Sequence, residues 1–235
     1  MSALSENLRT DFTKLARLAV CHLLKPWGAL LLAFAVLHPW PVYAAAPGAT
    51  VGPILVVGDS LSAEYGLKRG TGWVALLEKQ LAGEKKAVRV VNASISGDTT
   101  SGGRSRLPAL LAQHKPSLVV LELGGNDALR GLPLDMTEKN LTVMTQAAKK
   151  AGARVLLLGM QVPPNYGNAY SATFYGLFEK IAKAEKVALV PFFLKGIADV
   201  DSAAGNFQAD RIHPNAQAQA KMLANVWPEL KKIIP

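Results

Sequence analysis

Polar clusters that could support acyl transfer follow three apolar runs of this 235-residue sequence. They are Gly58-Asp59-Ser60, Ser96-Gly97-Asp98 and Gly124-Gly125-Asn126-Asp127. A fourth cluster, Asp210-Arg211-Ile212-His213-Pro214, lies near the carboxyl terminus. Acyl transfer requires a nucleophilic hydroxyl, a base, a group that orients the base, and donors for the oxyanion. Together the four clusters contain all of these residue types.

Ser60 is the candidate nucleophile and His213 the candidate base. Of the four histidines, only two follow residue 46, and His114 ends a predicted helix, where a solvated imidazole is typical. Asp210 lies three residues before His213 and could orient its ring. Either motif alone is weak, since an Asp-x-x-His spacing is common in turns and Asp59-Ser60 is equally typical of a helix cap. Because both motifs occur together with the other clusters, a catalytic role for Ser60, Asp210 and His213 is favoured.

Candidate oxyanion donors are the Gly97 amide, the Asn126 side-chain amide and the Ser60 amide. Glycine allows the backbone to approach a ligand closely, although Gly and Asn also dominate ordinary turns. Taken singly, Gly97 and Asn126 are each better explained by turn chemistry, and only their coincidence with the other clusters favours a role in the reaction. Asp59 and Asp127 are predicted to fix their turns by local hydrogen bonds, without a role in the reaction.

Alternating strands and helices position these clusters. The apolar pattern predicts strands at 54–57, 88–95, 118–123, 155–158 and 187–193, and helices at 73–81, 99–113, 137–151, 168–186 and from 215 onward. Pro191 indicates an edge strand, and Pro228 is expected to bend or split the last helix. Continuous apolar strands alternating with helices are typical of a parallel sheet that is covered on both faces. We therefore expect one three-layer α/β/α domain.

Residues 1–46 differ from the rest of the chain. Basic side chains come first, an apolar run follows, and small residues end the segment: Arg9, Lys14, Arg17 and Lys25, then Trp27 to Leu37, then Ala44 to Ala46. This order predicts a bacterial secretory signal peptide cleaved near 44–46, with an uncleaved anchor as the alternative. We expect a periplasmic or secreted protein whose single domain covers 47–235. The sole cysteine, Cys21, leaves with the signal, so the mature chain has no disulfide.

The net charge and the number of histidines limit which binding partners and cofactors are expected. The mature chain has 22 basic and 15 acidic side chains, a net charge of +7. The basic residues are scattered without interleaved aromatics, so nucleic acid is not expected as a partner. A metallophosphoesterase is a minor alternative, because its sites need several histidines and the mature chain has only two. We expect no metal, no cofactor, no stable membrane span after signal removal, and a monomer.

Taken together, the four clusters resemble those of the GDSL, or SGNH, hydrolase superfamily. The similarity extends to its bacterial multifunctional thioesterase I, lysophospholipase and arylesterase branch through Asn92–Thr99, Arg106–Leu111, Leu121–Asp127, Leu129–Gly131 and Pro164–Gly167. It covers nearly all of residues 53–235 and implies a flavodoxin-like parallel sheet of five strands in the order 2-1-3-4-5. It also implies a catalytic triad of Ser60, Asp210 and His213. Ser60, Gly97 and Asn126 would be its oxyanion donors.

The resemblance implies a serine hydrolase that cleaves acyl esters and thioesters through an acyl-enzyme on Ser60. Small acyl esters or thioesters, with lysophospholipids among them, are the expected substrates. Four residues after the fourth strand are candidate walls of an acyl groove: Pro163, Pro164, Asn165 and Tyr166. The stretch 198–207 departs from the branch, which leaves the acyl-chain preference open. A non-catalytic exported lipid-binding protein on the same fold is the alternative of another class.

Overall fold

The computed structural model describes residues 51–234, so the predicted signal peptide lies outside the described residues. Five parallel strands form one sheet in the order β2-β1-β3-β4-β5. They are β1 (Ile54–Gly58), β2 (Val90–Asn92), β3 (Leu118–Glu122), β4 (Arg154–Leu158) and β5 (Ala188–Val190). The strand order expected from the resemblance is confirmed.

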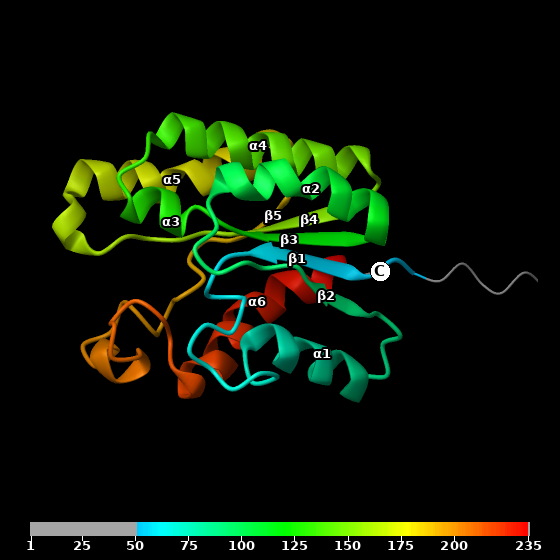
Figure 1. The fold of residues 1–235 in the computed structure, drawn as a ribbon, viewed down its shortest axis with the longest axis horizontal. Helices are drawn as coiled ribbons and strands as arrows, with labels where there is room; N and C mark the ends of the chain where they lie inside the picture. Colours follow the sequence, from blue (N-terminus) through cyan, green and yellow to red (C-terminus); the bar gives the residue numbers. More distant parts are fainter. Residues whose placement is uncertain (1–50, 235) are drawn as a thin grey trace, which may run out of the picture. The chain divides into compact units, whose positions relative to one another are not determined.

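Helices cover both faces of this sheet. Figure 1 shows α2, α3, α4 and α5 on one face and α1 and α6 on the other. Their bounds are α1 (Trp73–Gly83), α2 (Thr100–His114), α3 (Gly125–Leu129), α4 (Leu134–Lys150), α5 (Asn168–Glu185) and α6 (Gln219–Ile233). Short 3-10 turns are η1 (Pro164–Tyr166), η2 (Ala203–Asn206) and η3 (Ala216–Ala218). The three-layer α/β/α arrangement is therefore confirmed.

Burial explains why the central strands are apolar throughout. Every residue of β1 and β3 is buried, because helices pack against both faces of the sheet. A polar loop follows the carboxyl end of each of these two strands, on the left side of Figure 1. Parallel α/β sheets bind their ligands at this end of the strands. The apolar core thus fixes the starting point of the loops that carry the candidate site.

The two edge strands are shorter than the sequence predicts. β2 ends at Asn92, whose side-chain oxygen accepts the Ser94 amide at 3.1 Å. The Ala93 and Ile95 amides still donate to the Val56 and Gly58 carbonyls of β1, at 2.8 and 3.0 Å. β5 ends at Val190, directly before Pro191, which has no amide hydrogen for the ladder. Proline chemistry thus stops β5, whereas the chain after β2 becomes irregular but stays hydrogen-bonded to β1 as far as Ile95.

Four helical predictions need correction. The short helix α3 occupies 125–129, where a loop was expected after the third strand, and α4 begins at Leu134 rather than near 137. The chain after 215 first forms η3, capped by the Asn215 side chain, before α6 begins. Pro228 does not split α6, which runs through it with an inner face that includes Val226 and Leu230. Burial of that face compensates for the lost helical hydrogen bond. Among the described residues, no helix combines the length and apolar character needed to cross a membrane.

Candidate active site

The turn that carries Ser60 is shaped by Asp59. The Asp59 carbonyl accepts the amides of Ser62 and Ala63 at 3.2 and 2.9 Å, and its Oδ1 accepts the Leu61 amide at 3.0 Å. These bonds fold the chain back directly after β1, so that Ser60 sits on the outer bend of a tight turn. Asp59 therefore makes the local hydrogen bonds that its place in the sequence predicts.

A buried acid, Glu122, lies beneath the same turn. It ends β3 opposite Gly58, and its Oε2 accepts the Ser62 hydroxyl at 2.7 Å and the Asp59 amide at 3.3 Å. Trp73 in turn donates its indole N–H to the Ser62 hydroxyl at 3.1 Å. A Cβ at Gly58 would lie 2.7 Å from Glu122 Oε2, so this packing requires glycine there. The only sequence signal for Glu122 is an acid inside an apolar strand.

Burial sets the protonation of the two acids below the turn. Desolvation raises the pKa of Asp59 to about 6, against opposing hydrogen bonds from Leu61 and Asn126. Desolvation, followed by the charge of Asp59, raises the pKa of Glu122 well above its ordinary value. Two neighbouring carboxyls in an apolar setting favour holding a proton over carrying two charges. This pair therefore limits the negative charge beneath Ser60.

His213 joins Ser60 to Asp210 across 153 residues of sequence. Its Nε2 lies 2.8 Å from Ser60 Oγ, and its Nδ1 lies 2.7 Å from Asp210 Oδ2. Asp210 Oδ1 accepts the amides of His213 and Ile212 at 3.0 and 2.9 Å. These backbone bonds, then the ring contact, lower the pKa of Asp210 to about 2. An ionised Asp210 holds the proton on Nδ1, which leaves Nε2 free to accept the Ser60 proton.

Contacts outside the three residues hold the His213 loop in place. The Tyr65 ring lies against the His213 ring with centroids 4.3 Å apart. The Gln208 amide donates to the His213 carbonyl at 2.8 Å, and Gln208 Nε2 donates to the Tyr65 carbonyl at 2.9 Å. Gln208 thus ties the loop after β1 to the loop before α6. Sequence reasoning missed Tyr65. An aromatic residue five positions after the nucleophile is too weak a signal to predict contact with the base.

The candidate oxyanion donors face the same edge of the sheet. Gly97 adopts φ +78°, which glycine reaches without strain. Asn126, in α3, donates its Nδ2 to Asp59 Oδ2 and to the Asp98 carbonyl, both at 3.0 Å. Within residues 51–234, the Ser60 and Gly97 amides donate to no protein acceptor. These two amides are therefore available to a ligand, whereas the Asn126 amide is shared with two acceptors.

Two arginines anchor the Gly97 loop, and sequence reasoning assigned neither of them a role. Arg106 in α2 pairs with Asp98 through Nε at 2.8 Å and donates Nη2 to the Gly58 carbonyl at 3.3 Å and Nη1 to the Ala93 carbonyl. Arg130 donates Nη2 to the Gly97 carbonyl at 2.9 Å. Arg106 therefore links the end of β1 to the loop after β2.

The proposed wall after β4 is attached to α3. Tyr166 donates its hydroxyl to the Leu129 carbonyl at 3.1 Å, and Tyr170 does the same to Ala128 at 3.1 Å. Pro163 and Asn165 are exposed, Tyr166 is half-buried, and Pro164 begins η1. The wall thus lies beside the helix that carries Asn126.

Asp127 and His114, two other titratable side chains considered in the sequence, lie outside the line of contacts from Asp210 to Ser60. Asp127 accepts the Thr100 amide at 2.9 Å together with the Thr100 hydroxyl, and so holds the first turn of α2. His114 ends α2 and lines a hollow with Pro53, which directly precedes β1, whereas Ser60 follows the other end of that strand. In the part of the chain that the structure describes, no three His, Cys, Asp or Glu side chains cluster in a way that could hold a metal ion.

A model of the GDSL-like lipase/acylhydrolase family matches residues 56–221, which contain all four polar clusters. The chain belongs to this family. It is 56% identical to esterase TesA of Pseudomonas aeruginosa, over 77% of this chain and 89% of the relative. It is 45% identical to thioesterase 1/protease 1/lysophospholipase L1 of Escherichia coli K12, over 71% and 77%. The crystal structure of TesA superimposes with a TM-score of 0.75, covering 77% of this chain and 99% of that chain.

Family membership confirms the resemblance seen in the sequence, down to the esterase and thioesterase branch. The chain is an ester-cleaving serine hydrolase with the SGNH fold.

Proposed function

We propose that this hydrolase cleaves carboxylic esters and thioesters through an acyl-enzyme on Ser60. The observation that carries the proposal is the unbroken line from Asp210 through His213 to the Ser60 hydroxyl, with both contacts below 3 Å. A solvent-accessible serine in contact with an imidazole that a carboxylate orients is the arrangement that activates a hydroxyl for attack. Asp210 and His213 are accordingly the other two members of the proposed triad.

The reaction follows from these positions. Ser60 Oγ attacks the carbonyl carbon while its proton passes to His213 Nε2, and the carbonyl oxygen becomes the oxyanion. As the tetrahedral intermediate collapses, the bond to the alcohol or thiol breaks and His213 gives its proton to that leaving group. Water then attacks the acyl-enzyme, with His213 taking the proton of the water, and the free acid departs as Ser60 recovers its hydrogen.

The oxyanion would be held by the amides of Ser60 and Gly97, with Asn126 as a third donor. Each such donor typically contributes about 2.7–4 kcal/mol to the transition state. Asn126 must exchange one of its two present acceptors for the oxyanion. Because Asp59 is one of them, the buried acid pair influences how readily Asn126 turns.

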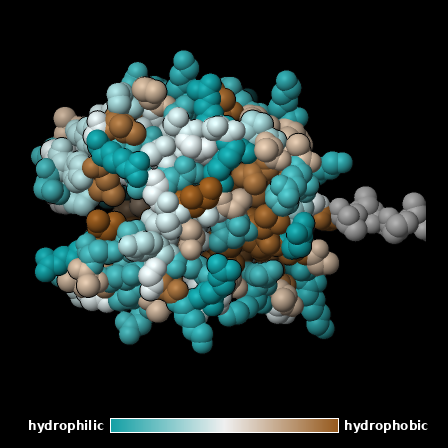
Figure 2. Space-filling model, viewed as in Figure 1, coloured by the Kyte–Doolittle hydropathy of each residue, from teal (hydrophilic) through white to brown (hydrophobic). Residues whose placement is uncertain are grey.

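Apolar surface near Ser60 supports acyl substrates. Tyr65, Ile95 and Ile212 are about half exposed, and each belongs to a loop that also carries a site residue. Figure 2 shows apolar surface bordering a recess on the side toward which the strands point. We assign the acyl chain to the side of η1, where Pro163, Pro164, Asn165 and Tyr166 form the wall. Short to medium acyl esters, thioesters and lysophospholipids are the proposed substrates, in keeping with the names of the relatives.

The place of action is also part of the proposal. Residues 1–46 would direct export and be removed near 44–46, which leaves a periplasmic or secreted domain without disulfides. Such a domain depends on its apolar core for stability, and the described residues form one continuous core cluster. We expect the mature chain to act as a monomer.

Replacing Ser60 by Ala tests the proposal directly. Hydrolysis of p-nitrophenyl butyrate should fall at least about a thousandfold, because the nucleophile is lost. A fluorophosphonate probe should label the wild-type protein and not the variant, and EDTA should leave wild-type turnover unchanged. Circular dichroism and the melting temperature check that Ser60→Ala is folded. Undiminished turnover by the folded variant would refute the assignment.

A further inference from the structure

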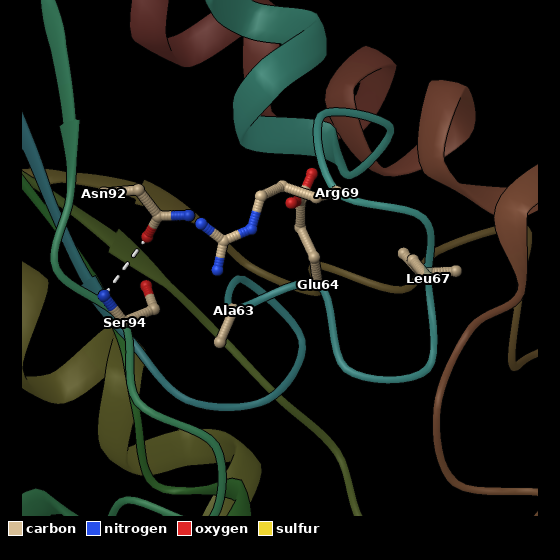
Figure 3. A pocket seen from close by; sticks show the side chains of 6 residues that line it. All are labelled: Ala63, Glu64, Leu67, Arg69, Asn92 and Ser94. Carbon is tan, nitrogen blue, oxygen red and sulfur yellow. Dashed lines mark hydrogen bonds between the residues drawn. The ribbon is translucent and has the colours of Figure 1, made fainter.

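A hollow beside the nucleophile turn has no part in the mechanism described so far. We call it the Arg69 pocket; it has a volume of about 440 Å³ and is lined by Ala63, Glu64, Leu67, Arg69, Asn92 and Ser94. Figure 3 shows Arg69 extending from the loop after β1 toward Asn92 and Ser94, which follow β2. The volume is within the range of small-ligand sites.

The walls of the Arg69 pocket are bonded to the turn that carries Ser60. The Ala63 amide donates to the Asp59 carbonyl at 2.9 Å, and Asn92 Nδ2 donates to the Ser62 carbonyl at 2.7 Å. The pocket therefore lies on the β2 side of the site. The proposed acyl wall follows β4, and β2 and β4 flank the β1–β3 pair from opposite sides. An ester held at Ser60 with its acyl chain toward η1 extends its other half toward this pocket.

His213 supports the same orientation. It must deliver a proton to the departing oxygen or sulfur, so the leaving group has to lie on the side of the imidazole. Tyr65, whose ring lies against His213, belongs to the loop that also supplies Ala63 and Arg69 to the pocket. The loop beside the proton donor and the wall of the pocket are thus one segment.

The groups that face the hollow suit a phosphate. Within residues 51–234, the exposed Arg69 side chain makes no hydrogen bond or ion pair, and the buried Ser94 hydroxyl has no partner. The Glu64 carboxylate also lines the hollow, but it accepts the amides of Gly70 and Gly72 at 2.9 and 2.7 Å and forms no ion pair with Arg69. A guanidinium and a free hydroxyl are donors that recognise phosphate oxygens.

We propose that the Arg69 pocket receives a phosphate group on the alcohol or thiol half of the substrate. This inference rests on the proposed hydrolysis at Ser60. Two sources share the chemistry, a lysophospholipid headgroup and a phosphorylated thiol carrier. Arg69 binds the phosphate and Ser94 donates a second hydrogen bond, so that both lower KM for phosphate-bearing substrates without taking part in bond cleavage.

The test compares octanoyl substrates that share the acyl chain and differ in whether the leaving half carries phosphate. Octanoyl-lysophosphatidylcholine is paired with 1-octanoylglycerol, and octanoyl-CoA with octanoyl-pantetheine. Arg69→Gln should raise KM for a phosphate-bearing member about fivefold and leave kcat and the neutral member unchanged, because only the charge-assisted contact is lost. Ser94→Ala should act in the same direction by about twofold. Arg89→Gln is the matched control, an exposed arginine that lines a different hollow, with His114 and Lys115.

Each result decides the inference. If Arg69→Gln raises KM only for the lysophospholipid, the phosphate comes from the headgroup. If it raises KM only for octanoyl-CoA, the phosphate comes from the thiol carrier. The proposal would be overturned if Arg69→Gln left KM unchanged for both phosphate-bearing substrates, or raised KM equally for the neutral substrates. The same rise in KM in Arg89→Gln would also overturn it.

Binding can be followed without catalysis. Glycerol 3-phosphate added to the Ser60→Ala protein should shift the amide resonances of Ala63 and Ser94, and Arg69→Gln in that background should abolish the shifts. Inactive wild-type protein that still shows them would refute hydrolysis at Ser60 and retain the phosphate site. Active protein without the shifts would refute the phosphate site alone.

Discussion

At the scale of single residues, Asp210 has the most constrained position in the site. Both of its carboxylate oxygens are engaged, one with two backbone amides and the other with the His213 ring. The carboxylate is therefore rigid although its side chain remains 34% exposed. A fixed carboxylate sets the tautomer of the imidazole, and the tautomer decides whether Nε2 can accept a proton.

Replacing Asp210 by Asn should test this control of the tautomer. The amide keeps much of the shape but favours the wrong ring proton, so kcat should fall about a thousand- to ten thousandfold with little change in KM. Initial rates with p-nitrophenyl butyrate measure the effect. Asp201→Asn, on an exposed aspartate of the neighbouring segment, should retain full activity. A loss of less than tenfold in Asp210→Asn would show that the carboxylate does not orient the ring.

The low pKa of Asp210 also predicts an acid limit. Its folded value of about 2 lies below the ordinary 3.8, so the stability that it contributes is present above pH 4 and is lost as the pH falls toward 2. Protonation in that window should also release the His213 ring. The free energy of unfolding of Asp210→Asn, measured by urea titration, should converge on that of wild type between pH 4 and 2. A constant gap across this range would contradict the assignment.

At the scale of elements, β1 and β3 meet at a buried pair of acids. Glu122 ends β3, and its Oε2 binds both the Asp59 amide and the Ser62 hydroxyl, on either side of Ser60. Glu122 Oε1 is buried without a hydrogen-bond partner among the described residues. A protonated or shared carboxyl is the form that this setting favours, because a second charge would be costly there.

Glu122→Gln should reveal this cost through the pH dependence of stability. The folded pKa of Asp59 is raised from 3.8 to about 6, and that of Glu122 is raised as well, so the folded state binds protons more tightly than the unfolded chain. The free energy of unfolding contributed by these acids therefore falls as pH rises from about 4 past 6. Glutamine can still accept both hydrogen bonds and has no charge. In urea titrations, the free energy of unfolding of Glu122→Gln should therefore increase relative to that of wild type as pH rises.

A hydrophobic replacement supplies the control for that experiment. Glu122→Leu removes the acceptor of Ser62 and Asp59 as well as the charge, so kcat should fall while Glu122→Gln remains near wild type. Should the stability difference between Glu122→Gln and wild type stay constant between pH 4 and 8, the acids would not be coupled to folding as described.

At the scale of the whole molecule, all four polar clusters belong to one compact unit, residues 46–235. The central strands, the helices and every candidate site residue lie within it. Folding and chemistry should therefore be independent of the amino-terminal segment.

A chain beginning at Pro47 tests this independence. It should show kcat/KM within about twofold of the full-length chain and the same melting temperature, because the core of the described residues begins at Ile54. Size-exclusion chromatography should report a monomer, and mass measurement of the exported protein should place the cleavage near 44–46. A chain beginning at Asp59 is the control and should not fold, since it lacks β1. An unfolded Pro47 chain would show that the amino-terminal segment is part of the domain.

The sequence by itself determined the layered α/β/α class and the identity of the proposed triad. Continuous apolar runs such as 54–57 and 118–121 report burial on two faces, and the polar residues after them form blocks that are specific to one family. Both signals are local in the chain. They required no knowledge of how distant segments pack.

The tertiary structure decided everything that depends on contacts between distant segments. The 2.8 Å approach of His213 to Ser60, the Tyr65 ring behind it, the Arg106 anchor and the acid pair under the turn each join residues from different elements. No pattern along the chain encodes these distances, because they result from packing loops against a common sheet edge. The sequence also overestimated the length of both edge strands: β5 ends before Pro191, and the regular part of β2 ends at Asn92.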